Sequence, residues 1–204
     1  AALCAVVLPD AGHLQEEEAA YANRKGFSKH SPAKPLYTED DARRSLGHLV
    51  AHAFGTELEV APGVFVTLEP AGHILGSAIV RVRLEDAGDR TIVFSGDLGR
   101  PHHPLLQPPS PIGDADVVVL ESTYGDRLHD DTGSLDRFRD AIVRTAARGG
   151  TVLIPAFAVD RTEVLLFHLR QLHEAGRLPA VPVYVDSPMA LAALSVYRDA
   201  IDGH

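Results

Sequence analysis

The sequence predicts an α/β fold, because an alternating β-rich segment is followed by apolar strands that are separated by helices. From 78 to 84 arginines alternate with aliphatic residues, which is the pattern of a strand with one buried face. Later, VVVLEST, VLIPAF and VPVYVDS are continuous apolar runs separated by segments of helical length. Strands without alternation, joined by helices, indicate a parallel sheet buried on both faces. We therefore expect a β-meander first and parallel βαβ units after it.

The N-terminal part is expected to begin with a buried strand, because AALCAVVLP is a continuous apolar run that stops at Pro9. A polar helix should follow from about 15 to 24, and then a loop rich in Ser, Pro and Lys from 25 to 35. A second helix should start at Thr38, an N-cap residue that precedes an acidic first turn. Apolar residues at helical spacing extend this helix to Ala53.

The central part is expected to hold three short strands and then a connector. The strands begin at Val64, Ala78 and Thr91, with a turn at 87–89. The Pro-rich stretch PHHPLLQPPSP follows, and its histidines could line the same cleft as the strand ends, but solvent exposure is the ordinary state of such a connector. The two helices between the apolar strands are expected at 134–148 and 160–175.

Composition limits the class of protein. The chain has 204 residues with 45% hydrophobic content, which is ordinary for a soluble globular protein, and its apolar runs are too short to span a membrane. A net charge of −9 argues against a surface that binds nucleic acid all over, although it leaves room for a local basic groove. A single cysteine, Cys4, excludes an internal disulfide and fits a reducing cytoplasm, so we expect a cytoplasmic protein.

Two residues at expected strand ends have side chains suited to zinc. His73 lies between strands in AGHILGSA, and Asp97 follows a strand in FSGDLGR, so both can point to the same end of one sheet. Taken singly, such a histidine is more often a hydrogen-bonded loop residue, and such an aspartate is often a turn residue or helix cap. Glu121 ends VVVL, where α/β sheets carry functional groups, but N-caps are common there too.

Five ordered segments resemble one family. GHILGSA, FSGDLGR, ESTYGD, IPAFAVDR and VDSPMA are similar, in this order and at these separations, to the β-CASP branch of the metallo-β-lactamase superfamily. That branch includes the pre-mRNA 3′-end processing endonuclease and its bacterial and archaeal ribonuclease relatives. DAGHLQEEEA and PLYTEDDA also have counterparts there, so the resemblance covers nearly the whole chain.

The resemblance implies roles for individual residues. His73 is expected to bind one of two Zn²⁺ ions and Asp97 to bridge both, while Glu121 is expected to orient a histidine that acts on the leaving group; we take Asp97 and Glu121 as the catalytic residues. Arg161 and Ser187 are expected to contact substrate, Arg161 through phosphate. Asp160 departs from the family pattern, in which we expect Gly or Glu at this position.

The resemblance also implies a domain plan. Residues 1–125 are expected to form part of the αββα metallo-β-lactamase fold, and residues 126–204 the first part of the β-CASP domain. The zinc motif HxHxDH is absent from the sequence and is expected upstream of Ala1, and the later histidine motifs beyond His204. We therefore expect residues 1–204 to be part of a longer protein and to be inactive alone.

The expected activity is zinc-dependent hydrolysis of RNA phosphodiester bonds, endo- or exonucleolytic, in RNA processing or decay. Single-stranded RNA is the expected substrate, DNA and a homodimer stay open, and no membrane partner is expected. One alternative is a lactamase-fold hydrolase of a small thioester or lactam, which the apolar strands after Glu121 disfavour. Another is a non-catalytic scaffold subunit, which His73, Asp97 and Glu121 disfavour.

Overall fold

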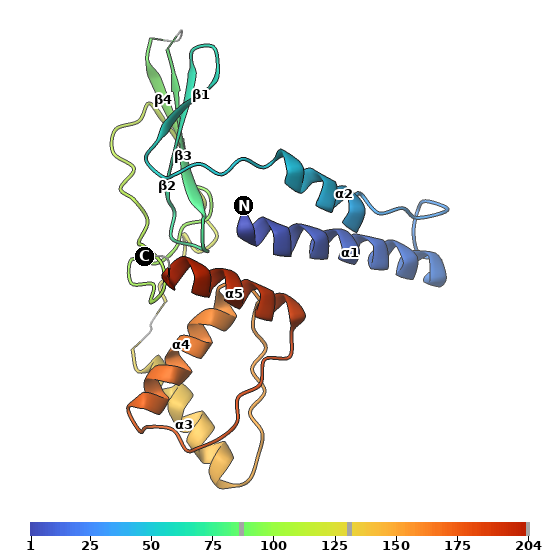
Figure 1. Cartoon of the computed structure of the whole chain (residues 1–204), viewed down its shortest axis with the longest axis vertical. Helices are drawn as coiled ribbons and strands as arrows, with labels where there is room; N and C mark the ends of the chain where they lie inside the picture. The colour runs from blue at the N-terminus through green and yellow to red at the C-terminus, as the bar shows by residue number, and fades with distance from the viewer. Residues whose placement is uncertain (86–87, 130–131, 203–204) are drawn as a thin grey trace. The chain divides into compact units, whose positions relative to one another are not determined.

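The chain divides into two compact units. The computed structural model describes residues 1–85, 88–129 and 132–202. One unit comprises Ala1–Ala51 and Ser187–His204, and the other comprises His52–Asp186 (Figure 1). Part of the turn expected at 87–89 lies outside the described residues. No described helix is both long enough and apolar enough to cross a bilayer.

The first unit is helical, and its N-terminus contradicts the predicted strand. Helix α1 spans Ala2–Lys25, so the strand expected to end at Pro9 is wrong and the helix expected at 15–24 is only the second part of a longer one. An apolar run of this length fits a buried helix as well as a strand, and its alanines and leucines favour helix. Pro9 lies inside α1, where it removes one backbone hydrogen bond without ending the helix.

Helix α2 (Glu39–Ser45) begins where the sequence predicted but ends early. The Thr38 hydroxyl accepts the Asp41 N–H, and the Asp41 carboxylate accepts the Thr38 N–H, which is a capping box. A 3₁₀ turn, η1 (Leu46–His48), follows, and Leu49 is extended, so the predicted extension to Ala53 is wrong. Gly47 weakens a helix at this point, and the later apolar side chains have no buried face to join.

Close packing joins the helices of this unit. A Cβ on Gly12 would lie 2.6 Å from the carbonyl oxygen of Thr38, so the two chain segments touch backbone to backbone. Helix α5 (Pro188–Asp202) also contacts α1, and its Ala190, Ala193 and Tyr197 are buried.

The second unit is built on a five-stranded mixed sheet in the order β1-β2-β3-β4-β5. Strands β1 to β4 are labelled in Figure 1. The strands are β1 (Glu57–Ala61), β2 (Val64–Pro70), β3 (Ala78–Leu84), β4 (Arg90–Phe94) and β5 (Val117–Val119). Neighbours pair antiparallel except β4 and β5, which are parallel. The predicted meander is therefore confirmed. Its small core contains Ala71, Ile79 and Val93, against which Leu98 and Ile112 pack.

The rest of this unit contains the predicted helices without the predicted parallel strands. Helices α3 (Ser134–Ala147) and α4 (Arg161–Glu174) agree with the expected positions within one residue. Residues 152–157 and 181–186 form no strand, so the expected βαβ units are not formed here. Leu153, Phe157 and Tyr184 are 86%, 84% and 85% exposed. A strand needs a hydrogen-bonding neighbour, and no described strand pairs with these segments.

Candidate functional site

The turn that carries His73 is fixed by its own backbone. Gly72 adopts φ 68°, a left-handed conformation that glycine takes without strain, and thereby reverses the chain after β2. The N–H groups of His73 and Ile74 both donate to Ser77 Oγ, at 3.0 and 3.2 Å. The His73 side chain itself is exposed. The turn therefore fixes the backbone of His73 while its imidazole stays accessible.

Ser95 connects the ends of β4 and β5 just before Asp97. Its side chain is 1% exposed, and its N–H donates to the Val119 carbonyl at 2.9 Å. Its hydroxyl donates to the Gly96 carbonyl at 2.7 Å and accepts the Glu121 N–H at 3.0 Å. Asp97 follows as an exposed residue at the carboxyl end of β4. Asp97 and Glu121 thus follow adjacent parallel strands at the same end of the sheet.

The segment after Asp97 passes directly against the His73 turn. The Gly99 N–H donates to the Ala71 carbonyl at 2.8 Å. A Cβ on Gly99 would lie 1.6 Å from the Gly72 carbonyl oxygen and 2.6 Å from the His73 nitrogen. Only glycine permits this approach. The backbone therefore brings the His73 and Asp97 segments together.

Glu121 completes this edge as an ionised carboxylate. It accepts the Thr123 N–H at 2.9 Å and the Leu98 N–H at 3.4 Å. Hydrogen bonds from the Thr123 N–H and hydroxyl lower the pKa of the Glu121 carboxyl below its ordinary 4.5, with smaller contributions from the Leu98 N–H and the His73 imidazole. Backbone N–H groups of Leu98 and Thr123 therefore hold the Glu121 carboxylate at the end of β5.

The side chains at this end of the sheet are of the types that bind zinc, but they are too few to form a complete zinc site. Imidazole and carboxylate are zinc ligands, and zinc in proteins usually has four. Within the described ranges, no three His, Cys, Asp or Glu side chains are arranged to hold a metal ion. His73 and Asp97 thus fit two positions of a metal site, and these residues do not form one by themselves.

Arg161 is an exposed residue at the first position of α4 and belongs to a different segment of the unit. Its N–H donates to the Val159 carbonyl at 2.9 Å, across Asp160. The Asp160 carboxylate approaches His103 Nε2 at 3.1 Å. The His103 side chain is only 9% exposed, so the expected solvent-exposed connector is wrong at this residue. Nothing in the local pattern PHHPLL distinguishes His103 from the exposed His102.

Ser187 has a structural task in the first unit. Its hydroxyl accepts the Ala190 N–H at 3.2 Å, and its carbonyl accepts the Leu191 N–H at 3.1 Å, so it caps the start of α5. The structure therefore brings together the segments of His73, Asp97 and Glu121 in the second unit, whereas Ser187 belongs to the first unit. The roles of these residues in catalysis or substrate binding stay predictions.

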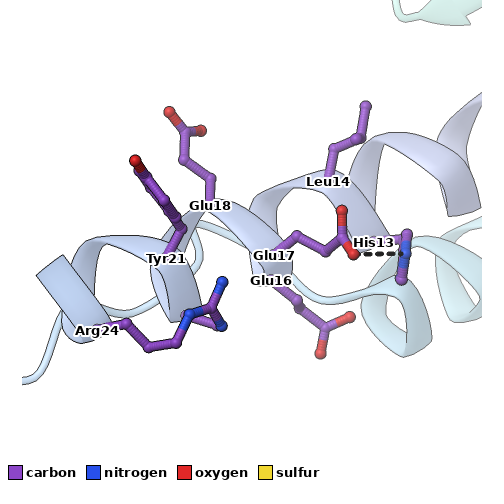
Figure 2. Close-up of a pocket in the computed structure, with 8 residues that line it drawn as sticks. His13, Leu14, Glu16, Glu17, Glu18, Tyr21 and Arg24 are labelled. Carbon is purple, nitrogen blue, oxygen red and sulfur yellow. Dashed lines mark ion pairs between the residues drawn. The ribbon is translucent and has the colours of Figure 1, made fainter.

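A shallow pocket on the surface of α1 is formed by residues between His13 and Arg24 and includes none of the predicted site residues. Figure 2 shows its lining, in which His13 Nε2 lies 3.6 Å from Glu17 Oε1. Glu16 is occupied as well, because it accepts the Glu39 N–H at 3.0 Å. The lining includes three glutamates and comes from one helix surface, so it indicates no nucleic-acid site.

Comparison with known proteins supplies close relatives. The chain is 39% identical over 165 residues to ribonuclease TTHA0252 from Thermus thermophilus, covering 80% of this chain and 37% of the relative. It is 36% identical over 165 residues to RNase aCSPSF2 from Saccharolobus solfataricus, covering 79% and 32%. It is 35% identical over 177 residues to cleavage and polyadenylation specificity factor subunit 3-I from Arabidopsis thaliana, covering 85% and 25%. No protein-family model matches. The chain thus spans well under half the length of these curated relatives.

Proposed function

Because this chain belongs to the β-CASP branch of the metallo-β-lactamase superfamily, we propose that the whole protein is a zinc-dependent ribonuclease. Two of the relatives carry ribonuclease in their names, and the family is metal-dependent. The observation that carries the proposal is the approach of Gly99 to the Gly72–His73 peptide, which brings the His73 and Asp97 segments together at one end of the sheet. The Glu121 N–H donates to the Ser95 hydroxyl and the Leu98 N–H donates to the Glu121 carboxylate, and these hydrogen bonds connect Glu121 to the Asp97 segment. We further propose two zinc ions, with His73 binding one and Asp97 bridging both.

In this proposal each residue has a separate task. The metal ions would supply positive charge that stabilises the phosphoryl oxygens as charge develops on them. Glu121 is ionised at neutral pH because its pKa is lowered, so its carboxylate can accept a hydrogen bond from a histidine and hold that ring in one tautomer. Arg161, at the start of α4, would bind a phosphate of the RNA chain through its guanidinium.

We propose the same domain plan that the sequence predicted. Residues 1–125 would belong to the metallo-β-lactamase domain, and residues 126–204 would begin the β-CASP domain. The position of the five strands between Glu57 and Val119, followed by helices, supports this boundary. Single-stranded RNA in the cytoplasm is the proposed substrate.

The test uses the whole protein. Zinc content and cleavage of labelled single-stranded RNA should fall together in His73→Ala and in Asp97→Ala. His30→Ala is the matched control, because His30 lies in an exposed loop of the first unit and should leave both quantities unchanged. Full cleavage in both site variants would contradict the assignment. A single-stranded DNA of the same sequence tests the substrate class, and a circular RNA distinguishes internal cleavage from cleavage at an end.

A further inference from the structure

His103 uses every hydrogen-bonding atom of its ring. Its Nδ1 accepts the N–H groups of Leu105 and Leu106, at 3.2 and 3.1 Å. Because Nδ1 accepts, the ring proton lies on Nε2, which faces the two carboxylate oxygens of Asp160 at 3.1 and 3.3 Å. The side chains of His103 and Asp160 are 9% and 18% exposed. This pairing joins residues 57 positions apart.

Asp160 has a backbone conformation that L-residues seldom adopt. Its φ is 70° and its ψ is −56°, and the Arg161 N–H donates to the Val159 carbonyl across it. These angles and this hydrogen bond define a classic γ-turn, which is rare and strained. Such strain persists only where the surroundings stabilise it. The Asp160 side chain does not cap α4, although it stands at the N-cap position, and it is directed to His103 instead. The bond to His103 therefore joins the hydrogen bonds from the Thr162 N–H and hydroxyl to the Phe157 carbonyl as a contact that stabilises this turn.

The segment that carries His103 is also attached to the His73 turn. A Cβ on Gly72 would lie 2.7 Å from the Gln107 carbonyl oxygen and 3.0 Å from Pro109 Cδ. The Ser110 N–H donates to the Pro70 carbonyl at 2.8 Å. The connector therefore contacts Asp160 through His103 and contacts the His73 turn through the residues from Gln107 to Ser110.

We propose that His103 is a positioning residue that acts through Asp160. By holding the γ-turn at Asp160, it fixes the start of α4, and with it Arg161, relative to the edge that carries His73 and Asp97. The expected effect of His103 on RNA binding rests on the proposed function, in which Arg161 binds phosphate. The effect of His103 on the γ-turn is inferred only from the His103–Asp160 contact and the backbone angles of Asp160.

Two substitutions distinguish the contribution of His103 Nδ1 from that of His103 Nε2. His103→Asn retains an acceptor near Nδ1 and loses the donor at Nε2, whereas His103→Gln retains a donor near Nε2. Amide hydrogen exchange of the chain, followed by NMR, gives the readout. In His103→Asn the Arg161 amide should exchange at least tenfold faster, while the Leu105 and Leu106 amides keep their protection. In His103→Gln the Arg161 amide should stay protected. Unchanged Arg161 exchange in His103→Asn, with the protein folded, would overturn the proposal.

The consequence for RNA is tested in the whole protein. Arg161→Ala should weaken RNA binding and lower the slope of log binding constant against log salt by about 0.7, the value for one phosphate contact on a single strand. His103→Asn should raise KM and lower the same slope in part, with kcat and zinc content unchanged. Combined with Arg161→Ala, His103→Asn should add almost nothing, because Arg161 is then gone. Additive effects would overturn the positioning role. If the unmodified protein binds no RNA, the proposed function fails, whereas the amide exchange result still decides the link to Asp160.

Discussion

Gly99 and Gly72 lie so close that a Cβ on Gly99 would be 1.6 Å from the Gly72 carbonyl oxygen. Gly99→Ala cannot be accommodated without moving the His73 turn, because the contacting atoms are backbone. We expect a loss of about 3 kcal/mol or more in the free energy of unfolding, measured by urea denaturation of the chain. Gly125→Ala is the control in the same unit, because its Cβ would meet Ser122 only at an ordinary 3.4 Å. Equal stability of the two variants would show that the close approach does not exist in solution.

Glu121 predicts a pH dependence of stability. Its pKa is lowered in the folded chain, so the unfolded chain binds the proton more readily. The stabilising contribution is therefore present above the ordinary carboxyl pKa of 4.5 and is lost as pH falls through the lowered folded value. Glu121→Gln should show a smaller loss of stability between pH 7 and pH 3. Asp41, Glu57 and Asp136 also have lowered pKa values, so the difference between the two proteins is the quantity to compare. A difference that does not change with pH would contradict the hydrogen bonds from Thr123 and Leu98.

For Glu163 we expect a dependence of stability on pH that is opposite in sign to that of Glu121. It is 3% exposed, and neither carboxylate oxygen makes a hydrogen bond of full geometry within the described residues, although the N–H groups of Glu163 and Asp160 lie close enough to oppose part of the effect of burial on its pKa. Burial raises the pKa of Glu163, so the folded chain binds the proton more readily and stability falls as pH rises through the raised value. Glu163→Gln should stabilise the chain by about 1 kcal/mol at pH 7 and by less at pH 4. Urea denaturation at both values is the measurement, and Glu174→Gln, on the exposed end of α4, is the control. A loss of stability at pH 7 would show that the N–H groups of Glu163 and Asp160 stabilise the carboxylate by more than its burial costs.

The γ-turn at Asp160 predicts an interaction between two substitutions. Asp160→Gly relieves backbone strain and also removes the bond to His103, so its effect alone should be small. In a His103→Ala background the bond to His103 is already lost, so Asp160→Gly should be more favourable to stability by about 1 to 2 kcal/mol than the same substitution in the unmodified chain. A double-mutant cycle in urea measures this coupling. Zero coupling energy would separate the two residues energetically despite their 3.1 Å contact.

Metal binding by the chain alone should be weak. Within the described residues no group of three ligands exists, so residues 1–204 should lose added zinc during desalting. The same preparation should not cleave RNA. Metal analysis after desalting gives the answer, and retention of two zinc ions per chain would mean that the ligands of the site have been assigned wrongly.

The sequence predicted the part of the fold in which local pattern and pairing agree. Strands β2 and β3 begin at the predicted Val64 and Ala78, and Gly72 allows the chain to reverse between them. The predicted single buried face of β3 is wrong, because its residues are partly buried on both faces, apart from the buried Ile79. The continuous apolar run before Pro9 carried no such information, since burial inside helices and inside sheets selects the same residues. The prediction of a strand at 152–157 is wrong for another reason, because a strand needs a hydrogen-bonding neighbour that local sequence does not specify.

The candidate site was also predictable only in part, namely for residues that directly follow a strand. His73 and Asp97 follow β2 and β4, whose carboxyl ends lie at the same end of the sheet, so spacing made it plausible that they converge. The association of Glu121 with them came from the family resemblance, and the pairing of β4 with β5 places its backbone at that end. His103 was missed because its partner Asp160 lies 57 positions away, and no periodicity connects a connector histidine with a helix start. The same holds for Ser95, whose buried hydroxyl joins two strand ends that are distant in sequence.

Strand β5 has a consequence for handling the chain. It is the last strand of the described sheet, it has three residues, and Val117, Val118 and Val119 are 47%, 46% and 49% exposed. An apolar edge strand without charge or proline is a template on which a second molecule can add its own strand. Self-association of the isolated chain through this edge would depend on concentration and would be suppressed by Val118→Lys. A dimer that disappears in that variant is edge-to-edge aggregation and says nothing about the assembly of the whole protein.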